Sequence, residues 1–183
     1  MRIIIFIIIF PIILNANFIG MNDGARSLGM GNAFIALSDN PDAVFYNPAG
    51  LARQNQLNIT ASIQNPYGVS DLISGMVAIS FPTPLIRTGL AIQRVSLIDI
   101  YSEDILYISA AGIVKFKTIP IRFGGSIKYE SAKVENYENI KSPYNFDLDF
   151  GLLIDLSDNL FFGYSVKNLL EPEFEFISQK DKV

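Results

Sequence analysis

The chain has 183 residues, a formal net charge of -4, and no cysteine, histidine or tryptophan. Without cysteine or histidine it lacks a disulfide framework, a thiol nucleophile and the usual zinc ligands, so zinc sites and the common catalytic triads are excluded. Charged residues are only 17% of the chain, against about a quarter in a typical soluble domain. The basic residues form no stripe of the kind that binds nucleic acid. We therefore expect no enzyme activity, no cofactor and no nucleic-acid partner.

Residues 1–16 read MRIIIFIIIFPIILNA. One arginine precedes an apolar run from Ile3 to Leu14, which is too short to span a bilayer as a helix. A small residue, Ala16, follows the run, and together these features predict a secretory signal peptide over 1–16. The exact cleavage site stays open. The alternative is a buried apolar helix or strand at the start of a soluble protein.

Residues 17–56 show neither the period of a long helix nor that of a strand. Asn40-Pro41 and Asn47-Pro48 each join a capping residue to a proline suited to the first helical position. They predict two short helical turns, over 41–46 and 48–52. The small apolar stretch 30–37 is expected to pack against an inner wall. We interpret 17–56 as a compact, irregular plug.

The rest of the chain, 57–183, is predicted to form strands, because apolar and polar residues alternate with period two. The expected strands are 57–64, 72–81, 86–95, 105–116, 121–134, 144–156 and 160–169. Their connections alternate between long (65–71, 96–104, 135–143) and short (82–84, 117–120, 157–159). Outer-membrane barrels show such alternation, and their interfaces carry aromatic girdles that would suit the 14 Phe and 8 Tyr. A half-buried sheet of a soluble sandwich is the alternative.

Two groups of acidic residues are candidate sites. Asp147 and Asp149 lie two residues apart on one strand face, but no partner set for catalysis accompanies them. They are interpreted as lining a wet lumen and pairing with cations on adjacent strands. The acidic residues of 96–104 lack the spacing of a calcium loop and are interpreted as a solvated loop. The predicted lumen-facing residues are Arg122, Lys128, Asp147, Asp149 and Lys167, and no metal site is expected.

The hairpin between the last two strands allows a specific prediction. Placing Leu156 opposite Leu160 aligns the apolar faces of the two strands. A register shifted by one residue would turn every side chain of one strand to the wrong face. The loop is then three residues, ending in a left-handed Asn159. The same register sets Asp149 opposite Lys167.

The run GARSLGMGNAFIALSDNPDAVFYNPAGLA, Gly24 to Ala52, resembles the N-terminal signature of the PorV/PorQ outer-membrane proteins and, more distantly, of the FadL long-chain fatty-acid transporters. The resemblance returns from Asp158-Asn159-Leu160 to Val166-Lys167-Asn168-Leu169 and elsewhere is one of pattern only. It implies that the segment after the signal peptide forms a hatch inside a roughly fourteen-stranded barrel. The residues to which it assigns plugging or gating are Gly24, Arg26, Gly29, Met30, Gly31, Asp39, Asn47, Pro48, Ala49 and Gly50.

The expected fold is therefore all-β: an antiparallel, up-and-down transmembrane β-barrel with an N-terminal plug. About seven strands are present, which predicts the N-terminal half of a roughly fourteen-stranded barrel, with closure by dimerisation as an alternative. The expected location is the outer membrane, with its lipid bilayer as partner. The expected function is passage of hydrophobic molecules through the plugged barrel. The alternatives are a PorV-like component of type IX secretion that binds exported cargo proteins, and a non-functional truncated fragment.

Overall fold

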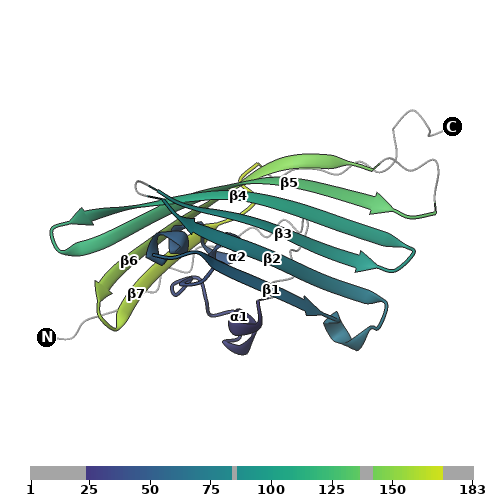
Figure 1. The fold of residues 1–183 in the computed structure, drawn as a ribbon, viewed down its shortest axis with the longest axis horizontal. Helices are drawn as coiled ribbons and strands as arrows, with labels where there is room; N and C mark the ends of the chain where they lie inside the picture. The colour runs from purple at the N-terminus through teal and green to yellow at the C-terminus, as the bar shows by residue number, and fades with distance from the viewer. Residues whose placement is uncertain (1–23, 84–85, 137–141, 171–183) are drawn as a thin grey trace, which may run out of the picture.

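The computed structural model of the chain describes residues 24–83, 86–136 and 142–170. Its main feature is one antiparallel sheet of seven strands in sequence order, each strand hydrogen-bonded to the next along the chain. The sheet is curled into a half-barrel (Figure 1). The strands are β1 (Asn58–Gln64), β2 (Leu72–Pro82), β3 (Arg87–Leu97), β4 (Tyr101–Phe116), β5 (Ile119–Val134), β6 (Tyr144–Ser157) and β7 (Leu160–Val166).

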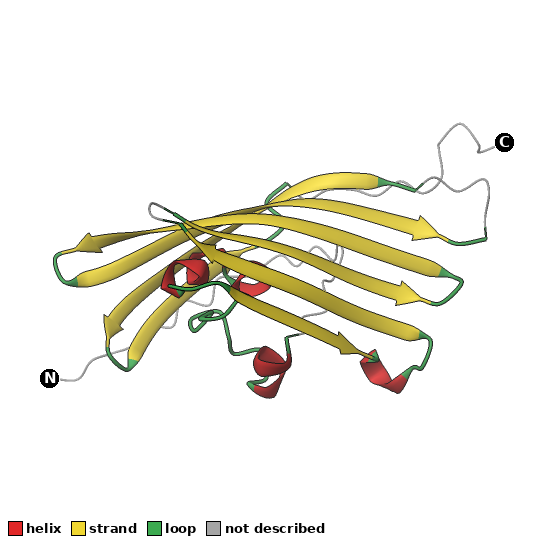
Figure 2. Cartoon of the chain, in the orientation of Figure 1, coloured by secondary structure: helices red, strands yellow, loops and turns green. Residues whose placement is uncertain are grey.

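Four short helical pieces accompany the sheet in the described residues, three of them in the segment that precedes it (Figure 2). They are α1 (Ala25–Gly29), α2 (Ala43–Tyr46), and the 3-10 turns η1 (Pro48–Arg53) and η2 (Pro66–Gly68). The two turns predicted from the Asn-Pro pairs are confirmed, whereas α1 was not predicted. No helix in the described parts of the chain is long and apolar enough to cross a membrane.

The period-two pattern sorts side chains onto two faces of the sheet. On β5, Ser126, Lys128 and Glu130 are buried. Ile127, which lies between two of them, and Phe123, which precedes them, are exposed. The first set faces the N-terminal segment 24–53, since η1 contacts β3, β4, β5 and β6. We call this side the concave face and the opposite side the convex face. We expect segment 24–53 to pack against the inner, polar-lined face, and the contacts of η1 and α2 with the strands bear this out for the later part of the segment.

The connection between β3 and β4 differs from the prediction. The expected loop 96–104 shrinks to 98–100, because β3 runs to Leu97 and β4 begins at Tyr101. The ladder continues through Arg94 opposite Asp104, and these two side chains form an ion pair with Nε and Oδ1 3.5 Å apart. Cross-strand pairing of opposite charges lets polar residues stay within strands. The predicted alternation of long and short connections is therefore wrong at this position.

The β6–β7 hairpin confirms the predicted register from Phe150 to Ile154, but the predicted Leu156–Leu160 pair and the predicted loop are wrong, because Leu160 lies opposite Ser157. Ile154 lies opposite Phe162 and Phe150 opposite Val166. The loop, however, has two residues, and the register shifts between Asp155 and Ser157. A bulge in β6 takes up the extra residue, so the predicted positive φ at Asn159 is wrong.

The left-handed asparagine of this region is instead Asn168, with φ 57°, just beyond β7. The β6–β7 ladder ends at the Phe150–Val166 pair, so Asp149 and Lys167 do not form the expected cross-strand pair within it. The expected signal peptide 1–16, the first part of the expected plug and the tail after residue 170 lie outside the described residues.

Candidate functional site

The candidate site is the interface between the N-terminal segment 24–53 and the concave face. A row of glycines on β5, β6 and β7 lies directly under this segment. A Cβ atom built on Gly124 would lie 2.5 Å from the carbonyl carbon of Pro48, and one on Gly163 would lie 2.5 Å from Ala36 Cα. One on Gly151 would overlap Asn47 Oδ1 and lie 2.9 Å from Pro48 Cδ. Such distances leave no room for any side chain, so the glycines let the segment approach the backbone of the sheet.

Asn47 joins the segment to two strands at once. Its side chain is fully buried, and its Nδ2 lies 3.0 Å from Ile35 O, 3.1 Å from Leu152 O on β6 and 3.3 Å from Tyr164 O on β7. Its Oδ1 accepts from Ala49 N at 3.2 Å, which caps η1 as the sequence predicted. One asparagine thus caps its own turn and donates to the carbonyls of the β6–β7 pair.

A second tether lies at the end of η1. Arg53 Nη2 donates to Asp155 Oδ1 on β6 at 2.6 Å, and the other carboxylate oxygen accepts from Arg122 on β5. Arg53 also donates to the carbonyl of Ala36 at 2.9 Å, and its guanidinium lies 4.9 Å from the ring centroid of Phe161. Asp155 therefore holds one arginine of the segment and one of the sheet with a single carboxylate, and charge-assisted bonds of this kind are the stronger ones.

An ionic cluster is buried further along the same face. Lys128 Nζ lies 3.2 Å from Glu130 Oε1, 3.2 Å from Asp147 Oδ2 and 3.0 Å from Asp149 Oδ1. None of the four side chains is more than 4% exposed. The ammonium also donates to Asn168 Oδ1.

Backbone donors complete this cluster. Asp147 Oδ1 accepts from the amides of Leu148 at 2.7 Å and Leu170 at 2.9 Å, and Asp149 Oδ1 accepts from Asn168 N at 2.9 Å. The cluster therefore folds the chain after β7 back onto the concave face. It offers no nucleophile beside a base. Among the residues that the structure describes, no group of acidic side chains has the arrangement of a metal site.

The other half of the interface is apolar and lies over β2, β3 and β4. Phe45 packs edge-on against Tyr107, with ring centroids 5.1 Å apart, and Phe34 packs likewise on Tyr46 at 5.3 Å. Buried residues of the strands, including Met76, extend this cluster. The segment therefore packs on apolar residues over β2, β3 and β4, and polar contacts hold it to the other strands.

The residues assigned to plugging or gating separate into two groups. Asn47, Pro48, Ala49 and Gly50 are buried against the sheet or against the segment itself. A Cβ on Gly50 would lie 2.5 Å from Ser38 Cβ, so that turn requires glycine.

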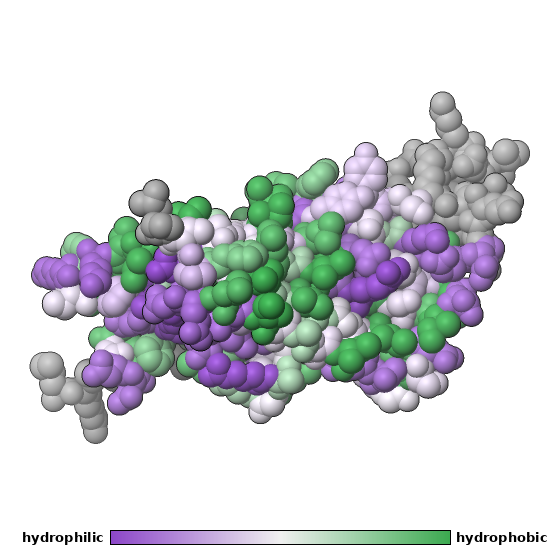
Figure 3. Space-filling view, viewed as in Figure 1, coloured by the Kyte–Doolittle hydropathy of each residue, from purple (hydrophilic) through white to green (hydrophobic). Residues whose placement is uncertain are grey.

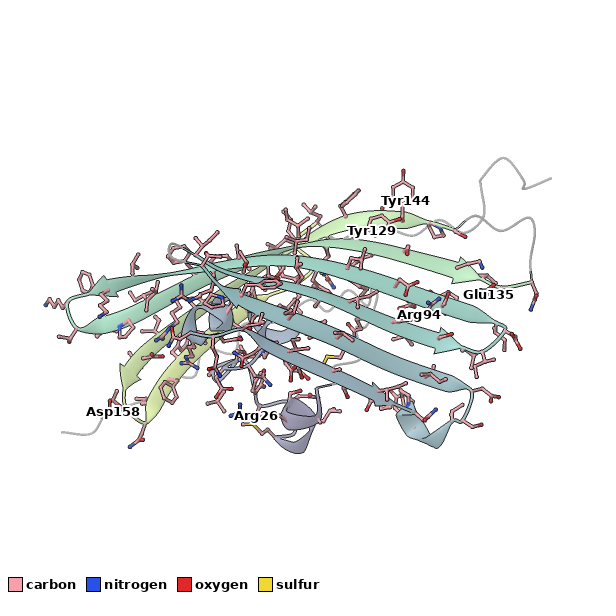
Figure 4. The ribbon with its side chains drawn as sticks, in the orientation of Figure 1. Arg26, Arg94, Tyr129, Glu135, Tyr144 and Asp158 are labelled. Carbon is pink, nitrogen blue, oxygen red and sulfur yellow. The ribbon has the colours of Figure 1, made fainter. Side chains whose placement is uncertain are left out.

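The second group belongs to α1 and the turns that follow it. Arg26, labelled in Figure 4, donates from Nη2 to Asp39 Oδ2 at 3.0 Å. Both side chains are more than a third exposed. Such surface pairs contribute about 0–1 kcal/mol. Gly31 has a φ of 62°, which favours glycine, whereas nothing lies within 4 Å of a Cβ on Gly29. Met30 packs partly buried against the apolar cluster, and a Cβ on Gly24 would lie 2.6 Å from an Asp42 carboxylate oxygen.

The five residues predicted to face the lumen all lie on the concave face. Arg122 belongs to the Arg53 tether, and Lys128, Asp147 and Asp149 form the buried cluster. Lys167 Nζ lies 5.6 Å from the ring centroid of Tyr46, so Lys167 points toward the segment and Lys128 is the partner of Asp149.

Four further residues of the site were not singled out from the sequence. They are Arg53, Glu130, Asp155 and Asn168. The period-two alternation places Glu130 on the face of Lys128 and Asp155 on the face of Asp147, although the predicted lumen-facing set did not include either residue. Nothing in the local sequence indicates the contacts that Arg53 and Asn168 make, because their partners lie on other strands.

Comparison of the chain with protein-family models, with curated proteins and with solved structures found no match.

Proposed function

We propose that the sheet is part of the wall of an outer-membrane β-barrel and that segment 24–53 plugs it, controlling the passage of hydrophobic molecules. The observation that carries the proposal is the sorting of the two faces. Lipid surrounds one face of such a wall, while the other faces a polar interior that often holds a plug. The convex face is apolar and exposed, whereas the concave face carries the buried ion pairs of β5 and β6 beside the apolar residues of β2 to β4 and is covered by the segment.

The exposed apolar residues of the convex face support this proposal. On β4, Leu106 is 46% exposed and Ile108 is 63% exposed; on β5, Ile127 is 55% exposed. A soluble monomer rarely exposes a contiguous apolar patch of this extent. Figure 3 shows apolar side chains across the middle of the visible face and hydrophilic ones toward both ends.

The height of the apolar band fits a bilayer. The convex positions of β4 from Leu106 to Phe116 rise about 33 Å along the strand. At the usual barrel tilt of about 35–45°, this gives a band about 23–27 Å tall, close to the roughly 25 Å of known barrels. Tyr129 and Tyr144 mark one end of the band (Figure 4), with ring centroids 6.0 Å apart, as in an interfacial girdle.

The edges of the sheet add a requirement to the proposal. Within the described residues, β1 and β7 each have one neighbouring strand. An open edge in lipid would leave backbone groups unpaired at several kcal/mol each. The proposal therefore includes further strands between β7 and β1 that close the wall.

Fluorescence in lipid tests the location of the sheet. Because the chain has no tryptophan, Ile108→Trp and Phe45→Trp each introduce a single fluorophore, one on the convex face and one under the segment. In vesicles that contain brominated acyl chains, we expect strong quenching of Ile108→Trp and little quenching of Phe45→Trp. Equal quenching of the two, or failure of the chain to enter the vesicles, would refute the proposed location.

Uptake tests the transport role. Cells that express the chain are expected to take up radiolabelled oleate faster than cells that lack it. Removing the Asn47 side chain should change that rate, because it loosens the segment over the proposed route. Unchanged oleate uptake together with a secreted protein co-purifying with the chain would replace transport with the cargo-binding function.

A further inference from the structure

A groove of about 700 Å³ lies over β1, β2 and β3, away from the interface described above. Its apolar lining comes mainly from convex positions, including Ile63, Ile73, Val77 and Ile92. Gly75 lies at its centre, opposite Ile63 on one side and Arg94 on the other. This volume lies within the roughly 300–1,000 Å³ typical of small-molecule sites.

Gly75 opens this groove without being required by the fold. A Cβ there would lie 3.5 Å from Ser62 O and 3.8 Å from Ile63 Cγ1, which are ordinary van der Waals distances. Its backbone does not have a positive φ. The glycines under segment 24–53, such as Gly151, are forced by backbone contact, but Gly75 is not. Its missing side chain instead leaves an open depression in an apolar surface.

Opposite charges lie at the rim of the groove. Arg94 lines it, and Arg94 Nε lies 3.5 Å from Asp104 Oδ1. The two side chains are 60% and 36% exposed, so the pair is accessible to a ligand. Arg94 lies opposite Gly75 on β2 and opposite Asp104 on β4, so the three residues form one row across the convex face. This row lies next to the apolar band.

An apolar groove that ends at an arginine and a carboxylate complements a lipid whose headgroup joins a phosphate to an ammonium. Guanidinium groups bind phosphate oxygens well, and a carboxylate accepts hydrogen bonds from a primary ammonium. We propose that this groove binds a phosphatidylethanolamine-type lipid, with an acyl chain over Gly75, the phosphate at Arg94 and the ammonium at Asp104. This inference rests on the proposed function, because it requires the convex face to meet lipid.

Spin-labelled lipids test the site on the full chain in phosphatidylcholine vesicles. The motionally restricted fraction of spin-labelled phosphatidylethanolamine should exceed that of phosphatidylcholine at least threefold. Gly75→Leu, which fills the groove, and Arg94→Gln should both abolish this preference. Asp104→Asn should remove the advantage of phosphatidylethanolamine over phosphatidylglycerol.

Gly125→Leu is the matched control, since Gly125 is also on the convex face and a Cβ there meets only Asp149 O, at 3.5 Å. It should keep the wild-type preference, and far-UV circular dichroism should show that all variants fold. No preference in the wild type, or equal loss in Gly75→Leu and Gly125→Leu, would overturn the inference. Ile108→Trp quenched by brominated lipid in the same vesicles would show that this failure leaves the membrane location intact.

Discussion

Asn47 provides the sharpest test of how the N-terminal segment is held on the sheet. Asn47→Ala removes a cap from η1, which costs about 1 kcal/mol. It also removes Nδ2, which lies within 3.3 Å of three backbone carbonyls in a fully buried site. Leaving buried acceptors unpaired costs about 1–3 kcal/mol. We therefore expect Asn47→Ala to destabilise the docked segment by about 2–4 kcal/mol.

Asn40 is the matched control, because it also precedes a proline. Its Oδ1 accepts from Asp42 N at 3.1 Å and its Nδ2 donates to Asp42 Oδ2 at 3.1 Å, so its side-chain bonds are local. Asn40→Ala should cost about 0.5–1 kcal/mol, the lower part of the capping range. Asn47→Asp separates the two contributions, because aspartate caps well but cannot donate. It should behave like Asn47→Ala if the bonds to the sheet dominate.

Limited trypsin digestion measures the effect on the segment. Arg53 is only 13% exposed, so cleavage after it requires the segment to lift from the sheet. When reclosing is fast, the cleavage rate follows the population of the open form. A loss of 2–4 kcal/mol predicts cleavage about 30 to 1,000 times faster in Asn47→Ala. Equal cleavage rates for Asn47→Ala and Asn40→Ala, with the sheet intact by circular dichroism, would refute the tethering argument.

Two further predictions concern the concave face, and urea unfolding followed by circular dichroism measures both. Gly151→Ala should lower the free energy of unfolding by about 1–3 kcal/mol, because its methyl group overlaps Asn47. Gly125→Ala, on the opposite face, should change it by less than about 0.5 kcal/mol, and similar losses would contradict the close approach. Lys128→Met should cost about 3–5 kcal/mol, because it leaves three buried carboxylates without their cation. Lys133→Met removes a lysine that is 59% exposed and should have little effect, so equal losses would show that burial of the cluster does not matter.

Most of the fold was predictable because strand patterns are local. Period-two alternation placed all seven strands and assigned Lys128, Asp147 and Asp149 to one face, since neighbouring side chains point to opposite sides of a strand. The Asn-Pro pairs located α2 and η1 for a similar reason, because a capping residue acts within its own turn. The errors came where partners on other strands decide the outcome. The Arg94–Asp104 pair extended two strands into a predicted loop, and a bulge after Asp155 replaced the predicted three-residue turn.

The sequence by itself determined the strands, the two faces and the short turns of the N-terminal segment, because backbone sterics and the alternation of side chains operate over a few residues. Only the tertiary structure decided which residues that are distant in the sequence contact one another. The contact of Asn47 with Leu152 and Tyr164 spans more than a hundred positions of the chain. The same holds for Arg53 and Asp155, and for Gly151 beneath Pro48. These contacts depend on how the curled sheet brings distant strands under the segment, and no local pattern encodes that curvature.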